Sequence, residues 1–163
     1  MTVETRLEAL VPQGHLHVVG GPVAEENRRA MERHFEAEWH DDLDAVMKTL
    51  VPDDCYQRVP SLGLEVRGPE AVRAFYARRI ETWPGQAFSQ EDVLIGPHVS
   101  RTAGTWTVKP IDEFLGLPAN GHRVHVPGYI SIEFRDGLIV GETLYFDSTD
   151  MAKQLLHGPD SLI

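Results

Sequence analysis

One acid interrupts an apolar row near the C-terminal end of the chain. Every second residue over 124–134 is apolar or glycine, the pattern of a half-buried β-strand. Asp136-Gly137 follows, which is the strongest short hairpin signal. The returning strand is predicted to place one acid, Glu142, in the middle of an apolar face made of Leu138, Val140, Leu144 and Phe146.

A carboxyl group in apolar surroundings can exchange protons near neutral pH, because desolvation raises its pKa. We therefore expect Glu142 to act as a general base that abstracts a proton next to a carbonyl, or as a general acid. Such proton transfer contributes roughly 10²- to 10⁴-fold in rate. The alternative interpretation is a buried acid paired with Arg58, or an acid at a solvated pocket mouth.

Three further residues are candidates for the same chemistry. Glu113 follows a strand end and could be the second carboxylate of an acid/base pair, or a solvated loop acid beside Asp112. Tyr56 and Arg58 alternate on one strand and therefore point the same way. If they point inward, Tyr56 could hydrogen-bond a carbonyl or enolate and Arg58 could hold a negative charge. Otherwise they are structural, and a buried Arg58 would need an acidic partner.

The substrate-binding wall is expected to combine residues of the first helix with the apolar hairpin face. His34 could line the pocket, and Trp39 is expected to form pocket wall or core. The hairpin contributes the apolar positions Ile130, Leu144 and Phe146. The implied partner is an apolar small molecule.

Neither a metal nor a cofactor is predicted. His15-x-His17 and His122-x-x-His125 lack a convincing third ligand. Gly20-Gly21-Pro22 lacks the strand–glycine–helix context of a phosphate loop.

The elements that must position these residues follow from hydrophobic spacing. Helices are predicted over 24–40, from 43 to about 50 after a cap at Asp41 or Asp42, from Pro69 to about 82, and over about 147–157. Strands are predicted over 55–60, 88–95 and 99–109 and in the hairpin, and 63–68 is predicted to be a turn region. Helices followed by mostly antiparallel strands predict an α+β fold with helices on one face of a curved sheet.

The chain divides into an extension over residues 1–23 and a single domain over 24–163. The extension contains glycines and prolines around a short apolar piece, Leu16–Val19, and is expected to be an arm with one short strand or helix. On the sheet face away from the helices, Tyr129 lies at the centre of a polar row, which favours a homodimer interface there.

Composition excludes several classes of function. The formal charge of −10 repels phosphate backbones and anionic lipid, so neither nucleic acid nor membrane is an expected partner. The apolar runs are too short for a membrane span, and the first ten residues lack a signal-peptide core. Cys55 is the only cysteine, which excludes an internal disulfide and favours the cytoplasm.

Three segments of the chain together resemble the SnoaL-like polyketide cyclases of the nuclear transport factor 2-like superfamily. They are Phe35-x-Ala37-x-Trp39-x-x-Asp42-Leu43-Asp44, then Glu113-Phe114-Leu115-Gly116-Leu117-Pro118-x-x-Gly121-x-x-Val124-x-Val126, and finally Phe134-x-Asp136-Gly137-x-Ile139-Val140-x-Glu142 with Tyr145-Phe146-Asp147 and Gln154-Leu155. The resemblance implies a cone-shaped, dimeric protein with helices packed on the concave face of the sheet around a pocket.

The chain departs from this family at the catalytic positions. The aspartate of the characterised cyclases and limonene epoxide hydrolases corresponds to Leu144 here. The asparagine of the hydrolases corresponds to Arg58, and their arginine and first aspartate fall near Ile111 and Glu113. The hydrolase triad is therefore absent, and any activity requires a different acid.

The leading hypothesis is a cofactor-independent enzyme that cyclises, isomerises or eliminates next to a carbonyl of an apolar substrate. It assigns the base to Glu142 and enolate stabilisation or proton donation to Tyr56, Arg58 or Glu113. The alternatives are a non-catalytic protein that binds a hydrophobic ligand or only dimerises, and an epoxide hydrolase with rearranged acids.

Overall fold

The computed structural model describes residues 14–119 and 121–158, and within them one mixed sheet carries the fold. Its strand order is β1-β4-β5-β6-β7-β2-β3. The strands are β1 (His15–Val18), β2 (Tyr56–Val59), β3 (Leu64–Arg67), β4 (Ala87–Ile95), β5 (Val99–Val108), β6 (Val124–Arg135) and β7 (Leu138–Phe146). The pairs β1–β4 and β2–β7 are parallel and the other four are antiparallel, so the predicted mostly antiparallel α+β architecture is confirmed.

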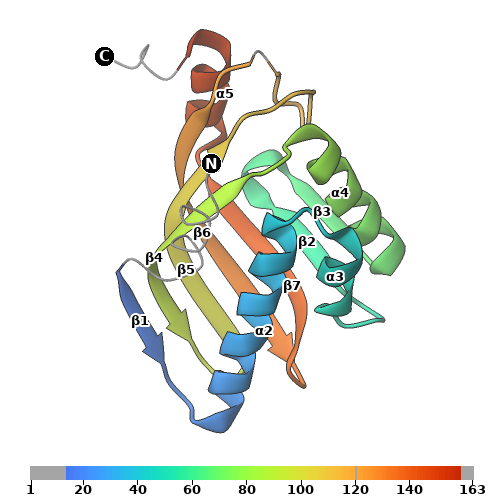
Figure 1. Ribbon diagram of the computed structural model, residues 1–163, viewed down its shortest axis with the longest axis vertical. Helices are drawn as coiled ribbons and strands as arrows, with labels where there is room; N and C mark the ends of the chain where they lie inside the picture. The colour runs from blue at the N-terminus through green and yellow to red at the C-terminus, as the bar shows by residue number, and fades with distance from the viewer. Residues whose placement is uncertain (1–13, 120, 159–163) are drawn as a thin grey trace.

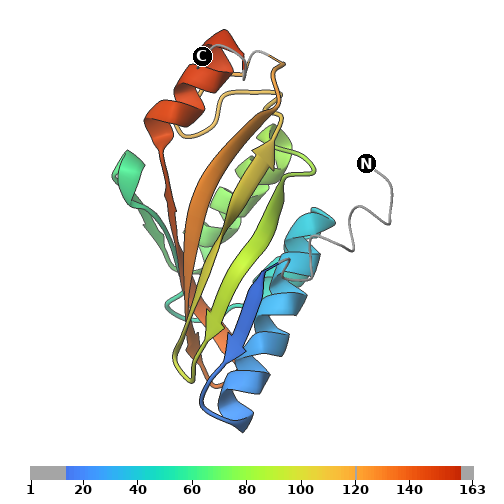
Figure 2. The ribbon, with the colours of Figure 1, turned by 90° about the vertical axis from the view of Figure 1, so that its left-hand side faces the viewer.

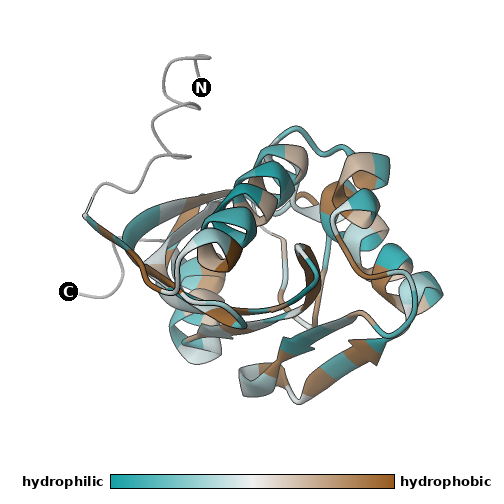
Figure 3. Ribbon diagram, turned by 90° about the horizontal axis from the view of Figure 1, so that it is seen from below, coloured by the Kyte–Doolittle hydropathy of each residue, from teal (hydrophilic) through white to brown (hydrophobic). Residues whose placement is uncertain are grey.

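Helices cover one face of this sheet (Figures 1 and 2). They are α2 (Pro22–Trp39), α3 (Leu43–Lys48) and α4 (Pro69–Thr82), and α5 (Ser148–His157) lies at the end of β7. Hydrophilic and hydrophobic residues alternate around the helices in Figure 3, as expected for helices with one buried side. None of the described helices is both long and apolar enough to cross a membrane.

Local sequence signals set the helix ends much as predicted. The Asp42 side chain accepts a hydrogen bond from the backbone N–H of Ala45 and caps α3. Pro69 lies in the first turn of α4, where its missing N–H costs nothing. Asp147 accepts hydrogen bonds from the N–H groups of Thr149 and Asp150 and caps α5.

Two predictions about strands need correction. Residues Leu64–Arg67 form the short edge strand β3 rather than a turn region, because their alternating residues pair antiparallel with β2. In β7, Val140 is an extra residue in a bulge, since Glu133 pairs with Gly141 whereas Phe134 pairs with Ile139. Ile139, and not Leu138 or Val140, therefore shares the inner face with Glu142.

The segment before the first long helix contributes to the sheet. Strand β1 lies parallel to β4 at the sheet edge, with His15 opposite Asp92 and Val18 opposite Ile95. Of the two options expected for this arm, the structure has the strand. The part of the extension before residue 14 lies outside the described residues, and the proposed boundary at residue 23 stays a prediction.

Candidate active site

A pocket lies between the inner sheet face and the helices, and aromatic side chains form a large part of its wall. Its free space, counted with the open mouth and the solvent there, is about 880 Å³. The aromatic side chains come from helices, strands and loops: Phe35, Trp39, Phe75, Tyr76, Trp83, Phe88, Trp106, Phe114 and Phe146. Such a wall favours a flat apolar ligand.

The four predicted apolar wall residues lie in this pocket. Trp39 comes from the end of α2, Ile130 from β6, and Leu144 and Phe146 from β7. Their alternation on β6 and β7 was readable from the sequence. Whether they contact a substrate stays a prediction.

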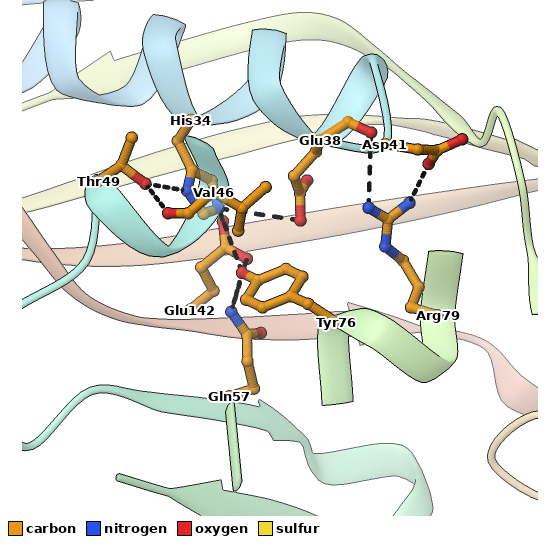
Figure 4. Close-up of polar contacts among 9 residues, drawn as sticks. All are labelled: His34, Glu38, Asp41, Val46, Thr49, Gln57, Tyr76, Arg79 and Glu142. Carbon is orange, nitrogen blue, oxygen red and sulfur yellow. Dashed lines mark hydrogen bonds and ion pairs between the residues drawn. The ribbon is translucent and has the colours of Figure 1, made fainter. Parts of the chain in front are cut away.

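Glu142 lies on the same wall, inside the pocket and only 2% exposed. Its Oε2 accepts hydrogen bonds from Gln57 Nε2 at 2.9 Å and from the Tyr76 hydroxyl at 3.0 Å (Figure 4). Its Oε1 has no hydrogen-bond donor among the described residues, but lies 3.5 Å from His34 Nε2. One oxygen is thus held by two hydrogen bonds, while the other faces His34 without a hydrogen bond.

His34 is fully buried behind Glu142, and α3 fixes its ring. The hydroxyl of Thr49 donates to the carbonyl of Val46 at 2.6 Å, so its oxygen accepts from His34 Nδ1–H, also at 2.6 Å. This pattern assigns a hydrogen to Nδ1 and turns Nε2 toward the acids. Nε2 lies 3.2 Å from the Tyr76 hydroxyl. His34 therefore supports the site from behind and is not itself part of the pocket wall.

Glu38 is the second carboxyl group of the site. It lies on α2 one turn after His34, with its carboxyl oxygen 3.8 Å from His34 Nε2 and its side chain 15% exposed toward the pocket. Burial, and then the charge of Glu142, raise the pKa of Glu38. The protonated form of Glu38 is therefore favoured relative to that of an exposed glutamate.

The pKa of Glu142 moves opposite to the prediction. Burial would raise the pKa of this carboxyl, but His34, Gln57 and Tyr76 outweigh it and lower the pKa below its usual value. Burial likewise disfavours the charged form of His34, but Glu142 overcomes it and raises the pKa of His34. The two form a buried ion pair, and the split between Glu142 and Glu38 is the arrangement that separates a base from an acid.

Tyr56 and Arg58 do not reach the pocket. They do point the same way, but toward the outer sheet face, where the Arg58 guanidinium lies 4.4 Å from the centre of the Tyr56 ring. Arg58 pairs with Glu65 at 2.9 Å, and the Tyr56 ring packs over Gly141. Gln57, the residue between them, points inward to Glu142, so the predicted strand was right and its inward positions were wrong.

Glu113 is also absent from the pocket. It is exposed in the loop after β5, where its Oε1 accepts a hydrogen bond from the N–H of Gly116 at 2.8 Å. Its neighbours Phe114 and Leu115 point into the pocket instead. This matches the alternative interpretation of Glu113 as a solvated loop acid.

Helical spacing was the signal that could have found the residues we missed. On α2, positions 31, 34, 35 and 38 follow the spacing i, i+3, i+4, i+7, and the last of them is Glu38. On α4, positions 72, 75, 76 and 79 follow the same spacing, and the last is Arg79. Residue type alone favours the apolar Ile80 for the inner face, whereas the structure buries Arg79.

The cluster of His34, Glu38 and Glu142 is the one group within the described residues that could hold a metal ion. Ligand atoms of His34, Glu38 and Glu142 all lie within 4.8 Å of one another. However, Glu142 Oε2 already accepts two hydrogen bonds, and Glu142 is paired with His34. The observed hydrogen bonds fit an acid/base cluster better than a set of metal ligands.

Comparison with known proteins places this fold and site in a family. The sequence model of the SnoaL-like domain matches residues 31–142, which is more than half of the chain and includes both His34 and Glu142. The chain therefore belongs to the SnoaL-like domain family. A comparison with curated proteins gave no match.

Solved structures confirm the nuclear transport factor 2-like fold. A proposed SnoaL-like polyketide cyclase from Jannaschia sp. CCS1 has a TM-score of 0.74 at 23% identity, over 85% of this chain and 97% of that one. An NTF2-like protein of unknown function from Burkholderia pseudomallei has a TM-score of 0.67 at 20% identity, over 81% and 98%. An LEH-like epoxide hydrolase of M. tuberculosis has 0.66 at 25%, over 84% and 94%.

Proposed function

We propose that this protein is a cofactor-independent enzyme that moves a proton at a carbon next to a carbonyl of an apolar, largely aromatic small molecule. The observation that carries this proposal is the buried cluster in which Glu142 is ionised beside His34 while Glu38 has a raised pKa, all at one wall of an aromatic pocket. Family membership and the neighbours named as cyclases are consistent with it.

In the proposed reaction the Glu142 carboxylate removes a proton from the carbon next to the carbonyl. The C–H electron pair moves into the new C=C bond, and the carbonyl electron pair moves to oxygen and gives an enolate. Paired with His34 and hydrogen-bonded by Tyr76 and Gln57, Glu142 is held in one orientation for this step.

Glu38 then completes the reaction by giving up its proton. If the enolate is conjugated with a second C=C bond, delivery to the far carbon of that system gives isomerisation. Delivery to an oxygen that departs from the carbon next to the deprotonated one gives elimination. If the enolate carbon attacks a second carbonyl, delivery to that carbonyl oxygen gives cyclisation. Glu38 takes the role that was predicted for Glu113, and the three outcomes share one first step.

That first step can be tested without knowing the natural substrate. In deuterated buffer, an enzyme that abstracts a proton next to a carbonyl exchanges it for deuterium, and ¹H NMR records the lost signal. We expect the protein to accelerate exchange in a panel of apolar cyclic ketones that begins with 2-tetralone. Glu142→Gln is expected to remove the acceleration, because a positioned general base contributes roughly 10²- to 10⁴-fold.

Glu65→Gln is the matched control. Glu65 also lies on a strand next to β2 and accepts a hydrogen bond there, but on the outer face and exposed. This variant is expected to exchange protons like the wild type. Equal exchange by wild type and Glu142→Gln would contradict the proposal. Ketone binding without exchange in the wild type would favour the alternative of a ligand-binding protein, and a diol formed from an epoxide would favour a hydrolase.

Two expectations about context also belong to the proposal. Tyr129 pairs with Tyr145 across the exposed outer face of β6 and β7, which favours a homodimer through this face. Light scattering on Tyr129→Asp should then report a monomer.

The buried Cys55 thiol favours the cytoplasm as the site of action.

A further inference from the structure

Two N–H groups in the pocket wall have nothing to bind. Arg79 is 3% exposed and Trp83 is 5% exposed, and both side chains line the pocket. Neither Arg79 Nε nor Trp83 Nε1 has a hydrogen-bond acceptor among the described residues. Leaving a buried donor unpaired is costly, so two of them on one pocket wall indicate an acceptor supplied by a ligand.

Their positions on the chain bring these two donors to one place. Arg79 lies in the last turn of α4 and Trp83 directly follows the helix, where its backbone N–H donates to the carbonyl of Arg79 at 2.7 Å. Trp83 is held there by an edge-to-face contact with Phe114, with ring centres 5.1 Å apart. Both groups can donate and neither can accept, so the missing partner must be an acceptor.

Arg79 is itself weakly bonded for a buried guanidinium. Its two contacts are both at 3.5 Å, one to the Asp41 carboxylate and one to the Glu38 carbonyl (Figure 4). Asp41 is fixed by a further hydrogen bond, since its Oδ2 accepts from the N–H of Gly85 at 3.1 Å. Most of the donors of Arg79 therefore remain available for a ligand, although its charge already faces Asp41.

The charges around this position favour a neutral acceptor. Asp41 balances Arg79, and Glu142 balances His34, so a ligand carboxylate would add an uncompensated negative charge near two acids. A carbonyl oxygen would bind as a neutral acceptor. It would then gain negative charge beside Arg79 only when the neighbouring carbon loses its proton, which is the condition under which fixed donors accelerate a reaction.

We propose that Arg79 and Trp83 form the subsite that binds the substrate carbonyl oxygen and stabilises it as an enolate. This inference rests on the proposed function and adds a requirement to the substrate: an aromatic or other flat apolar body with a neutral carbonyl. In this role Arg79 replaces Arg58, and Trp83 supplies the neutral hydrogen bond predicted for Tyr56.

Binding can be tested with three small probes of the same size: acetophenone, ethylbenzene and benzoate. Titration of the ¹⁵N-labelled protein is followed in ¹H–¹⁵N NMR spectra, which show the indole N–H of each tryptophan. Acetophenone is expected to bind roughly tenfold more tightly than ethylbenzene, and it alone should shift the Trp83 indole signal downfield. That signal is identified by its loss in Trp83→Phe.

Trp83→Phe also removes the donor while keeping an aromatic ring. We expect it to reduce the preference for acetophenone over ethylbenzene roughly three- to tenfold, the usual range for one hydrogen bond. Trp39→Phe makes the same change at another pocket tryptophan and should keep the preference. Arg79→Met should abolish it, but could unfold the protein, so the wild-type titration and Trp83→Phe decide the test.

The outcomes separate this inference from the proposed function. Equal affinity for acetophenone and ethylbenzene, with no shift of the Trp83 signal, would overturn the subsite even if ketones exchange protons. Tighter binding of benzoate than of acetophenone would overturn the assignment of a neutral acceptor. A preference for acetophenone that depends on Trp83, in a protein without proton exchange, would support the subsite and contradict the proposed reaction.

Discussion

Strand β2 has a carboxyl group beside it on each face of the sheet, Glu65 from β3 on the outer face and Glu142 from β7 on the inner face. Outside, Glu65 lies between Arg58 and Arg67 beside Tyr56, and it is exposed. Inside, Glu142 lies among His34, Gln57 and Tyr76, and it is buried.

Both carboxyl groups have a lowered pKa because their partners favour the charged form. Of the two, only Glu142 also acts through its charge on a second acid, Glu38, because both groups are largely buried and solvent screens them little. Burial, more than the choice of partner, turns the inner group into a set of acids with different pKa values.

The largest difference between the faces should appear in stability. Glu142→Leu leaves His34, Tyr76 and Gln57 without their shared acceptor, and removal of one partner of a buried ion pair costs about 3–5 kcal/mol. Denaturant unfolding at pH 6 measures this loss. Glu65→Leu, which breaks an exposed pair, should leave the unfolding midpoint almost unchanged. Equal shifts would show that the inner cluster has no special energetic role.

Glu38→Gln should sharpen the division between base and acid. Because Glu38 donates in its protonated form, wild-type turnover should fall as pH rises through its raised pKa. The amide cannot donate a proton to the product, so we expect turnover to fall roughly 10²-fold and this alkaline limb to disappear. Rates of ketone conversion across pH measure both effects. If the variant still lost turnover at high pH, this fall would belong to the titration of another group.

The two tyrosines give a smaller and closely matched comparison. Tyr76→Phe removes a hydrogen bond to the ionised Glu142, a contact of about 1.5–3 kcal/mol, and should slow exchange roughly tenfold or more. Tyr56→Phe makes the same change on the outer face and should leave the exchange rate unaltered. If Tyr56→Phe slowed exchange as much, the assignment of the outer face as a structural region would be wrong.

The smallest effect should be a pH dependence of stability. The pKa of His34 is raised in the folded protein, so its contribution is complete below its ordinary value of 6.5 and is lost as pH rises through the folded value. The pKa of Glu142 is lowered, so its contribution is present above 4.5 and lost as pH falls through the folded value.

The ion pair should therefore stabilise the fold most between about pH 4.5 and 6.5. The difference in Tm between wild type and Glu142→Gln, measured by calorimetry, should be largest in this window and shrink on either side. A difference that does not change with pH would contradict the ion pair.

The sequence predicted the elements well because their signals are local. Alternation along β6, the Asp136-Gly137 turn and the caps at Asp42 and Asp147 depend only on near neighbours. The inner position of Glu142 was also predictable, since Leu144 and Phe146 continue its face.

The partners of Glu142 were not predictable in the same way, because they depend on how strand and helix faces turn toward one another. Nothing near Gln57 shows which face of β2 is covered, and apolar identity favoured Ile80 over Arg79 although helical spacing favoured Arg79. The direction in which the pKa of Glu142 is shifted depends on His34, which lies more than one hundred positions earlier in the chain.

The bulge at Val140 makes the inward orientation of the base depend on one inserted residue. If Val140 instead paired with Glu133 in a regular ladder and the turn kept its register, every residue after it would move by one pairing position and turn to the other face of the sheet. Gly141 and Thr143 would then face the helices, and the carboxyl group of Glu142 would face outward. The bulge in this hairpin thus decides whether the carboxyl group of Glu142 lies in the pocket or on the outer face of the sheet.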